Sequence, residues 1–74
     1  MFKFTIFKSS IWNDEEINLE NFITDNLKEG ITQANSLTQK YINNGFVNDY
    51  TFFARAKMEC NKGLFYVNGL KLQR

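Results

Sequence analysis

Residues 50–60 read Tyr50-Thr-Phe-Phe-Ala-Arg-Ala-Lys-Met-Glu-Cys60, and this stretch decides the predicted fold. Every second residue from Tyr50 to Cys60 is apolar, whereas most of the residues between them are polar or charged. Successive side chains of a strand point to opposite faces of a sheet, so this alternation predicts a long strand with one buried face.

The residues after Cys60 predict two further strands joined by tight turns. Residues 61–63 contain a glycine and indicate a hairpin turn that leads into a strand over residues 64–67. Asn68-Gly69 favours a second tight turn, because both residue types tolerate positive φ. Leu70 and Leu72 then form a short closing strand.

Two more strands are predicted near the beginning of the chain. Residues 2–7 alternate between two faces, with Phe2, Phe4 and Ile6 on one and Lys3, Thr5 and Phe7 on the other. Ile17 and Leu19 alternate with polar neighbours in the same way. We expect this second strand to pair with the first.

From Thr24 the apolar residues recur with the period of an amphipathic helix. The expected apolar stripe consists of Leu27, Ile31, Ala34, Tyr41 and Ile42, with Leu37 at its edge. Thr24 is the expected N-cap and Asn44-Gly45 the expected C-terminal stop. Gly30 is unfavourable inside a helix, so it indicates either close packing on the sheet or a break. If it is a break, residues 13–29 form a separate first helix, with Asn13 as its N-cap.

The predicted order is therefore β-β-α-β-β-β in a single α+β domain over residues 1–74. We expect an antiparallel sheet of four to five strands with one amphipathic helix on one face. The opposite face has no second helix to cover it.

The composition offers little material for catalysis or metal binding. The 74 residues include no histidine and one cysteine, Cys60, which falls on the buried side of its predicted strand. The four glycines lie apart, so no phosphate-binding loop can be drawn, and a lone thiol cannot build a zinc site. We therefore expect a non-enzymatic protein with no cofactor and no metal. The lone cysteine and the absence of a signal-like or membrane-spanning stretch favour a cytoplasmic location, in the host cell if the chain is phage-encoded.

Two surfaces remain as candidate binding sites. The first is the sheet face opposite the helix, which carries aromatic and basic residues: Lys3, Phe7, Phe53, Arg55 and Lys57. Such a surface suits a protein partner, or single-stranded nucleic acid whose bases stack on rings. The second is an acidic surface formed by Trp12, Asp14, Glu15, Glu16 and Glu20. Either face could also be no more than a solvated exterior.

The predicted layout resembles that of compact phage-encoded inhibitors, including small anti-CRISPR proteins with a ββαβββ order. The resemblance rests on the helix entry Thr24-Asp-Asn-Leu-Lys-Glu-Gly-Ile-Thr-Gln-Ala34 and the closing hairpins around Gly63-Leu-Phe-Tyr-Val-Asn-Gly69. It contains no specific motif, so it assigns no functional residue. It implies a protein that occludes a bacterial nucleic-acid-processing complex, such as a CRISPR effector. The alternatives are a small single-stranded nucleic-acid-binding protein and a self-associating accessory protein, which could be a homodimer that buries the open sheet face.

Overall fold

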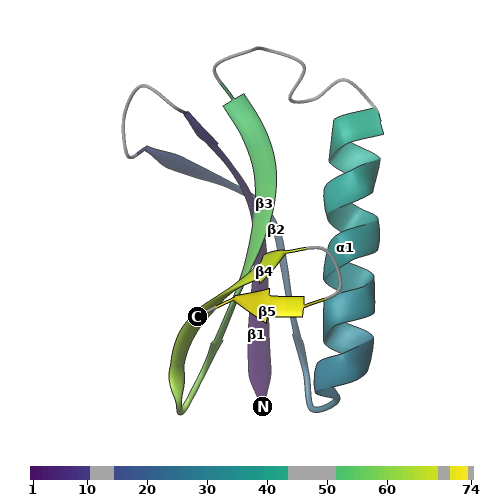
Figure 1. Ribbon diagram of the computed structural model, residues 1–74, viewed down its shortest axis with the longest axis vertical. Helices are drawn as coiled ribbons and strands as arrows, with labels where there is room; N and C mark the ends of the chain where they lie inside the picture. Colours follow the sequence, from purple (N-terminus) through teal and green to yellow (C-terminus); the bar gives the residue numbers. More distant parts are fainter. Residues whose placement is uncertain (11–14, 44–51, 69–70, 74) are drawn as a thin grey trace.

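The computed structural model describes residues 1–10, 15–43, 52–68 and 71–73. Five strands and one helix follow each other in the predicted order (Figure 1). They are β1 (Phe2–Ser10), β2 (Glu16–Thr24), α1 (Leu27–Asn43), β3 (Phe52–Cys60), β4 (Gly63–Asn68) and β5 (Lys71–Gln73).

The strands form one antiparallel sheet in the order β2-β1-β3-β4-β5. The helix α1 lies along one face of this sheet and contacts β1, β2, β3 and β4 (Figure 1). The predicted α+β class with one covered and one open face is therefore confirmed. The strand β3 is the middle strand of this order, and β1 lies between β2 and β3.

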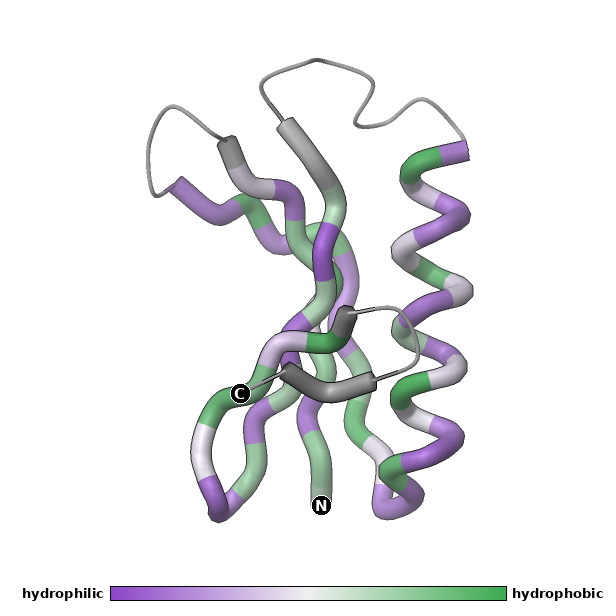
Figure 2. The backbone as a smooth tube through the Cα atoms, viewed as in Figure 1, coloured by the Kyte–Doolittle hydropathy of each residue, from purple (hydrophilic) through white to green (hydrophobic). Residues whose placement is uncertain are grey.

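The strand residues that alternate onto the helix side form the core between α1 and the sheet. Phe4, Ile6, Ala56 and Met58 are buried on the helix side, and Ala34 of α1 closes the layer from the other side. The mixture of polar and apolar residues along β1, β2, β3 and β4 is visible in Figure 2. Cys60 packs at the margin of this core and is half-buried. Tyr50 lies outside the described residues.

The strand β2 is longer than the sequence indicated. It extends to Thr24, whose Cα pairs with Phe2 of β1, and this pairing excludes a first helix over residues 13–29. The register shifts between Ile6 and Phe7, where Leu19 is the extra residue of a β-bulge. The bulge places Leu19 and its neighbour Glu20 beside the core.

The helix begins three residues after the predicted N-cap. Asn26, not Thr24, accepts the hydrogen bond from the Glu29 amide at 3.0 Å, while the Thr24 hydroxyl accepts one from the Asn26 amide at 3.1 Å. The prediction was wrong because pairing with β1 holds Thr24 in extended geometry. Gly30 is buried within the helix and does not break it, so the close-packing alternative is correct.

The apolar stripe of α1 also differs from the prediction at its C-terminal end. Leu37 packs against the core, whereas Ile42 is 44% exposed. At about 100° per residue, Ile42 lies about 80° from the direction of Ala34 and Leu37 about 60° from it on the other side. Ile31 lies about 60° from Ala34 on the side of Ile42 and still packs against the core, so the exposure of Ile42 reflects its place in the last turn of α1. The expected stop at Asn44-Gly45 lies outside the described residues.

The predicted hairpin at residues 61–63 is confirmed. Gly63 has φ of 124°, a conformation that side-chain-bearing residues rarely adopt. The following strand β4 pairs with β3 and with β5. Gly69 and Leu70 lie outside the described residues, so the second turn stays a prediction.

Candidate binding face on the open side of the sheet

The face of the sheet opposite α1, called the open face here, is defined by the strand registers. Residues paired across neighbouring strands share a face. Thr5 pairs with Lys57, Phe7 with Arg55, and Lys57 with Tyr66. The open face therefore includes the following described residues: Lys3, Thr5, Phe7, Glu16, Asn18, Arg55, Lys57, Glu59, Leu64 and Tyr66.

Phe7 lies on the predicted face but is not available as a contact group. Its ring is fully buried, at 0% exposure, although α1 does not cover this side of the sheet. The Tyr66 ring lies against it with centroids 6.3 Å apart, and the Lys57 ammonium group lies 4.9 Å from its centroid. The expectation that Phe7 is an exposed binding residue is therefore wrong. Among the described residues, Lys57 and Tyr66 lie over this ring.

Cations lie over both described aromatic rings of the open face. The Arg55 guanidinium lies 4.7 Å from the Tyr66 centroid, which parallels the contact between Lys57 and Phe7. A cation over a ring face contributes about 0.5–1 kcal/mol at exposed sites and more where water is excluded. The predicted mixture of aromatic and basic residues is present, but its members bind each other.

The two surfaces that the sequence offered as alternatives meet at one ion pair. Lys57 Nζ donates a hydrogen bond to Glu16 Oε1 at 2.7 Å, and the two side chains are 24% and 34% exposed. Glu16 lies on β2 and Lys57 on β3, with β1 between them. The basic face and part of the acidic segment are therefore one continuous surface.

The other members of the predicted acidic surface do not gather there. Glu15 is exposed, and Glu20 pairs in register with Ile6, which places it on the helix side. Trp12 and Asp14 lie outside the described residues. The backbone of Phe53 pairs with Ser9 of β1, and its side chain is outside the description.

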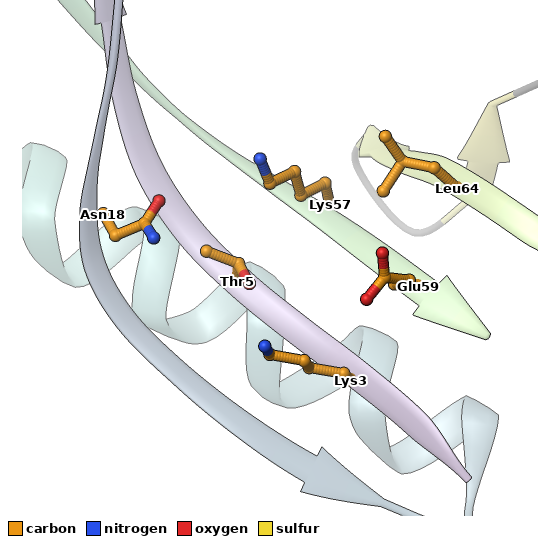
Figure 3. Close-up of a pocket in the computed structure, with 6 residues that line it drawn as sticks. All are labelled: Lys3, Thr5, Asn18, Lys57, Glu59 and Leu64. Carbon is orange, nitrogen blue, oxygen red and sulfur yellow. The ribbon is translucent and has the colours of Figure 1, made fainter.

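A hollow of about 240 Å³ lies on the open face (Figure 3). Its lining residues come from β1, β2, β3 and β4, and they are Lys3, Thr5, Asn18, Lys57, Glu59 and Leu64. In Figure 3 the Lys3 ammonium group extends towards β2 and away from the Glu59 carboxylate, although these two residues pair in register. The hollow thus combines two ammonium groups, a hydroxyl, an amide and a carboxylate beside one apolar side chain.

Sequence reasoning identified Lys3 and Lys57 as binding residues and placed Thr5 on the same face without naming it as one, and it missed the other three residues. Glu59 could have been found, because it alternates onto the same face as the two lysines. Asn18 and Leu64 could not, since their position depends on the order of strands in the sheet.

A second hollow of about 360 Å³ lies at one end of the core, where the start of α1 meets the β3–β4 hairpin. Its lining is mostly apolar: Phe2, Leu27, Met58, Cys60, Asn61, Lys62 and Phe65.

Within the described ranges, no three histidine, cysteine, aspartate or glutamate residues are grouped so that they could hold a metal ion. In the same part of the chain, no helix is long and apolar enough to cross a membrane. No protein-family model, curated protein or solved structure matches this chain.

Proposed function

We propose that this protein is a non-enzymatic binding domain that occupies a protein surface of a larger complex through its open face. The observation that carries the proposal is the hollow between Lys3 and Lys57 together with the ion pair and ring contacts that fix its wall. A helix covers the other face of the sheet, whereas no described element covers this one, which is charged and hollowed.

The open face is ordered before any partner arrives. Lys57 is held at once by Glu16 and by the Phe7 ring, and Arg55 is held over Tyr66. Immobilising a long cationic side chain on binding normally costs about 0.5–1.5 kcal/mol of binding free energy. Here that cost is largely met on folding, which supports a role in recognition.

The chemistry of the hollow favours an acidic side chain of the partner. A carboxylate placed between Lys3 and Lys57 can accept charge-assisted hydrogen bonds from both ammonium groups, with the Thr5 hydroxyl as a further donor. Leu64, 50% exposed at the rim, offers an apolar contact to the rest of that partner. Glu59 on the same rim disfavours a partner that is acidic throughout.

Nucleic-acid binding by base stacking has less support. A base can stack on a ring only if one ring face is open, and the Phe7 ring is covered by Lys57 and Tyr66. The resemblance in layout to phage-encoded inhibitors makes a bacterial nucleic-acid-processing complex the partner class that we propose. Inhibition then follows from occlusion of one of its surfaces.

The test compares two charge reversals on opposite sides of the protein. Lys3→Glu alters the hollow, whereas Lys28→Glu makes the same change on an exposed position of α1. Tagged wild type and both variants are used as baits in a bacterial lysate, and the captured complex is then titrated with each. We expect at least tenfold weaker binding for Lys3→Glu and an unchanged affinity for Lys28→Glu.

Two results contradict the proposal. One is that folded wild-type bait captures no complex. The other is that both variants bind as tightly as wild type. The inhibitor role is tested separately, by adding the protein to a purified CRISPR effector and measuring cleavage of its target DNA. If cleavage is not inhibited, a CRISPR effector is excluded as the partner, and the titration alone then tests the binding role.

A further inference from the structure

The strand β2 forms one edge of the sheet, and among the described residues no strand pairs with its outer side. It is nine residues long, whereas β5 at the other edge has three. An edge strand presents unpaired backbone amide and carbonyl groups, which makes it a template for a strand from another chain. Proteins protect such edges with proline, lysine, bulges or inward-pointing charges; β2 has the bulge at Leu19 and the inward-pointing Glu20 but no proline or lysine.

Glu20, near the middle of this edge, has a half-buried side chain and no partner among the described residues. It shares the helix side of the sheet with Ile6, and no hydrogen bond or ion pair joins it to any other described residue. The carboxylate oxygens of Glu20 are not among the buried, unpartnered atoms of the described residues. A cation supplied by another chain could therefore reach Glu20 and form a charge-assisted hydrogen bond with it.

Ile23 is a second residue on the same edge that an added strand would contact. Its side chain is 61% exposed, and its pairing with Lys3 places it on the open face. Glu20 and Ile23 are three residues apart and therefore lie on opposite faces of β2. A strand laid beside β2 would meet both of them, one on each of its own faces.

A second copy of β2 is a poor occupant of this edge. The strand β2 contains Glu16 and Glu20 and no lysine or arginine, so a second copy of β2 would offer no cation opposite Glu20. The bulge at Leu19 also disrupts any pairing that runs the full length of β2. Both features disfavour self-association and leave residues 20–24 open to a basic segment.

We propose that residues 20–24 of β2 bind an extended basic segment of a partner protein as an added strand. Backbone hydrogen bonds supply part of the affinity, as in other cases of strand addition. Specificity comes from a lysine or arginine opposite Glu20 and an apolar residue, three positions away, opposite Ile23. This goes beyond the proposed function, because it concerns the edge of the sheet and not the hollow of the open face.

The test uses a blocked nine-residue peptide, Thr-Val-Thr-Arg-Thr-Thr-Ile-Thr-Val, with full-length protein labelled with ¹⁵N. We expect the amides of residues 20–24 to shift and to exchange more slowly when the peptide is added. Replacing the peptide's arginine by glutamate, or methylating alternate backbone nitrogens, should weaken binding at least tenfold. The variant Glu20→Gln should weaken it about fivefold, while Glu29→Gln on the exposed side of α1 leaves it unchanged.

The wild-type amide map keeps the proposal testable even if Glu20→Gln fails to fold. Absence of binding at millimolar peptide would show that the bulge and Glu20 only protect the edge, and it would overturn the proposal. Amide shifts confined to the open face or to α1 would also overturn it. Equal effects of Glu20→Gln and Glu29→Gln on peptide binding would overturn it as well. Slower exchange of β2 amides with rising protein concentration alone would identify a second copy as the occupant.

Discussion

The ring of Phe4 occupies the space that a side chain on Gly30 would need. A Cβ built on Gly30 would lie 2.7 Å from Phe4 Cζ, closer still to Phe4 Cε1, and 2.9 Å from Thr24 Cγ2. Real Cβ atoms essentially never approach other atoms so closely. Phe4 is fully buried and stacks on Phe22, with ring centroids 5.1 Å apart, so it has no free space into which to move.

We therefore expect Gly30→Ala to destabilise the protein although alanine favours helices. Helix propensity alone predicts a gain of about 1 kcal/mol, whereas overpacking a core costs about 1–3 kcal/mol. The expected net change is a loss of up to about 2 kcal/mol in the free energy of unfolding, measured by urea denaturation. In a Phe4→Leu background the same substitution should cost less. A stabilised Gly30→Ala variant would show that the helix does not lie this close to β1.

The N-cap observed at Asn26 gives a second prediction. Its side-chain oxygen accepts a hydrogen bond from the Glu29 amide, which is otherwise unpaired in the first turn. Asn26→Ala should lower the free energy of unfolding by about 1 kcal/mol, and Asn26→Asp should leave it nearly unchanged. Ser36→Ala is the control, because Ser36 is exposed within α1 and alanine there should be neutral or slightly stabilising. Equal losses at both positions would argue against the cap.

Much of the fold could be predicted because its signals are local. The alternation in residues 52–60 and the helical period after Leu27 each lie within one element, and both agree with the structure. The N-cap could not be located, since Thr24 is held in β2 by pairing with Phe2, a residue 22 positions earlier. Element ends depend on such non-local pairing more than element types do.

The candidate site was predictable in composition and not in arrangement. Alternation placed Lys3 and Lys57 on one face correctly. It could not show that Lys57 covers Phe7 or that it reaches Glu16, because these contacts depend on strand order and span 50 and 41 positions of sequence. A ring expected to contact a partner is instead covered by the cation expected beside it.

The burial of Phe7 predicts that it stabilises the fold. Phe7→Ala should cost about 3 kcal/mol, within the range for a fully buried phenylalanine. Ile23→Ala, also on the open face but 61% exposed, should change stability by less than about 0.5 kcal/mol. Thermal and urea denaturation of both variants provide the comparison. If Phe7→Ala were as mild as Ile23→Ala, the Phe7 ring would be exposed in solution and stacking on it would become possible.

Lys57 has two roles: it forms an ion pair with Glu16, and it covers the ring of Phe7. As an ion pair at the surface it should contribute about 0.2–1 kcal/mol, and that coupling should shrink in about 1 M salt, where charges are screened within about 3 Å. As a cover for Phe7 it acts through its aliphatic stem, which is insensitive to salt. We expect Lys57→Met, which keeps an apolar stem, to cost less than about 1 kcal/mol, and Lys57→Ala, which uncovers the ring, to cost more.

A double-mutant cycle with Glu16→Gln and Lys57→Met measures the charge term directly, at low and high salt. Lys28→Met on the exposed side of α1 controls for the loss of a surface charge. Because Lys57 also lines the hollow, Lys57→Met should weaken partner binding even where it leaves stability nearly intact. A coupling energy that does not respond to salt would contradict the role of Lys57 in the ion pair. Equal stability of Lys57→Met and Lys57→Ala would contradict the role of its aliphatic stem as a cover for the Phe7 ring.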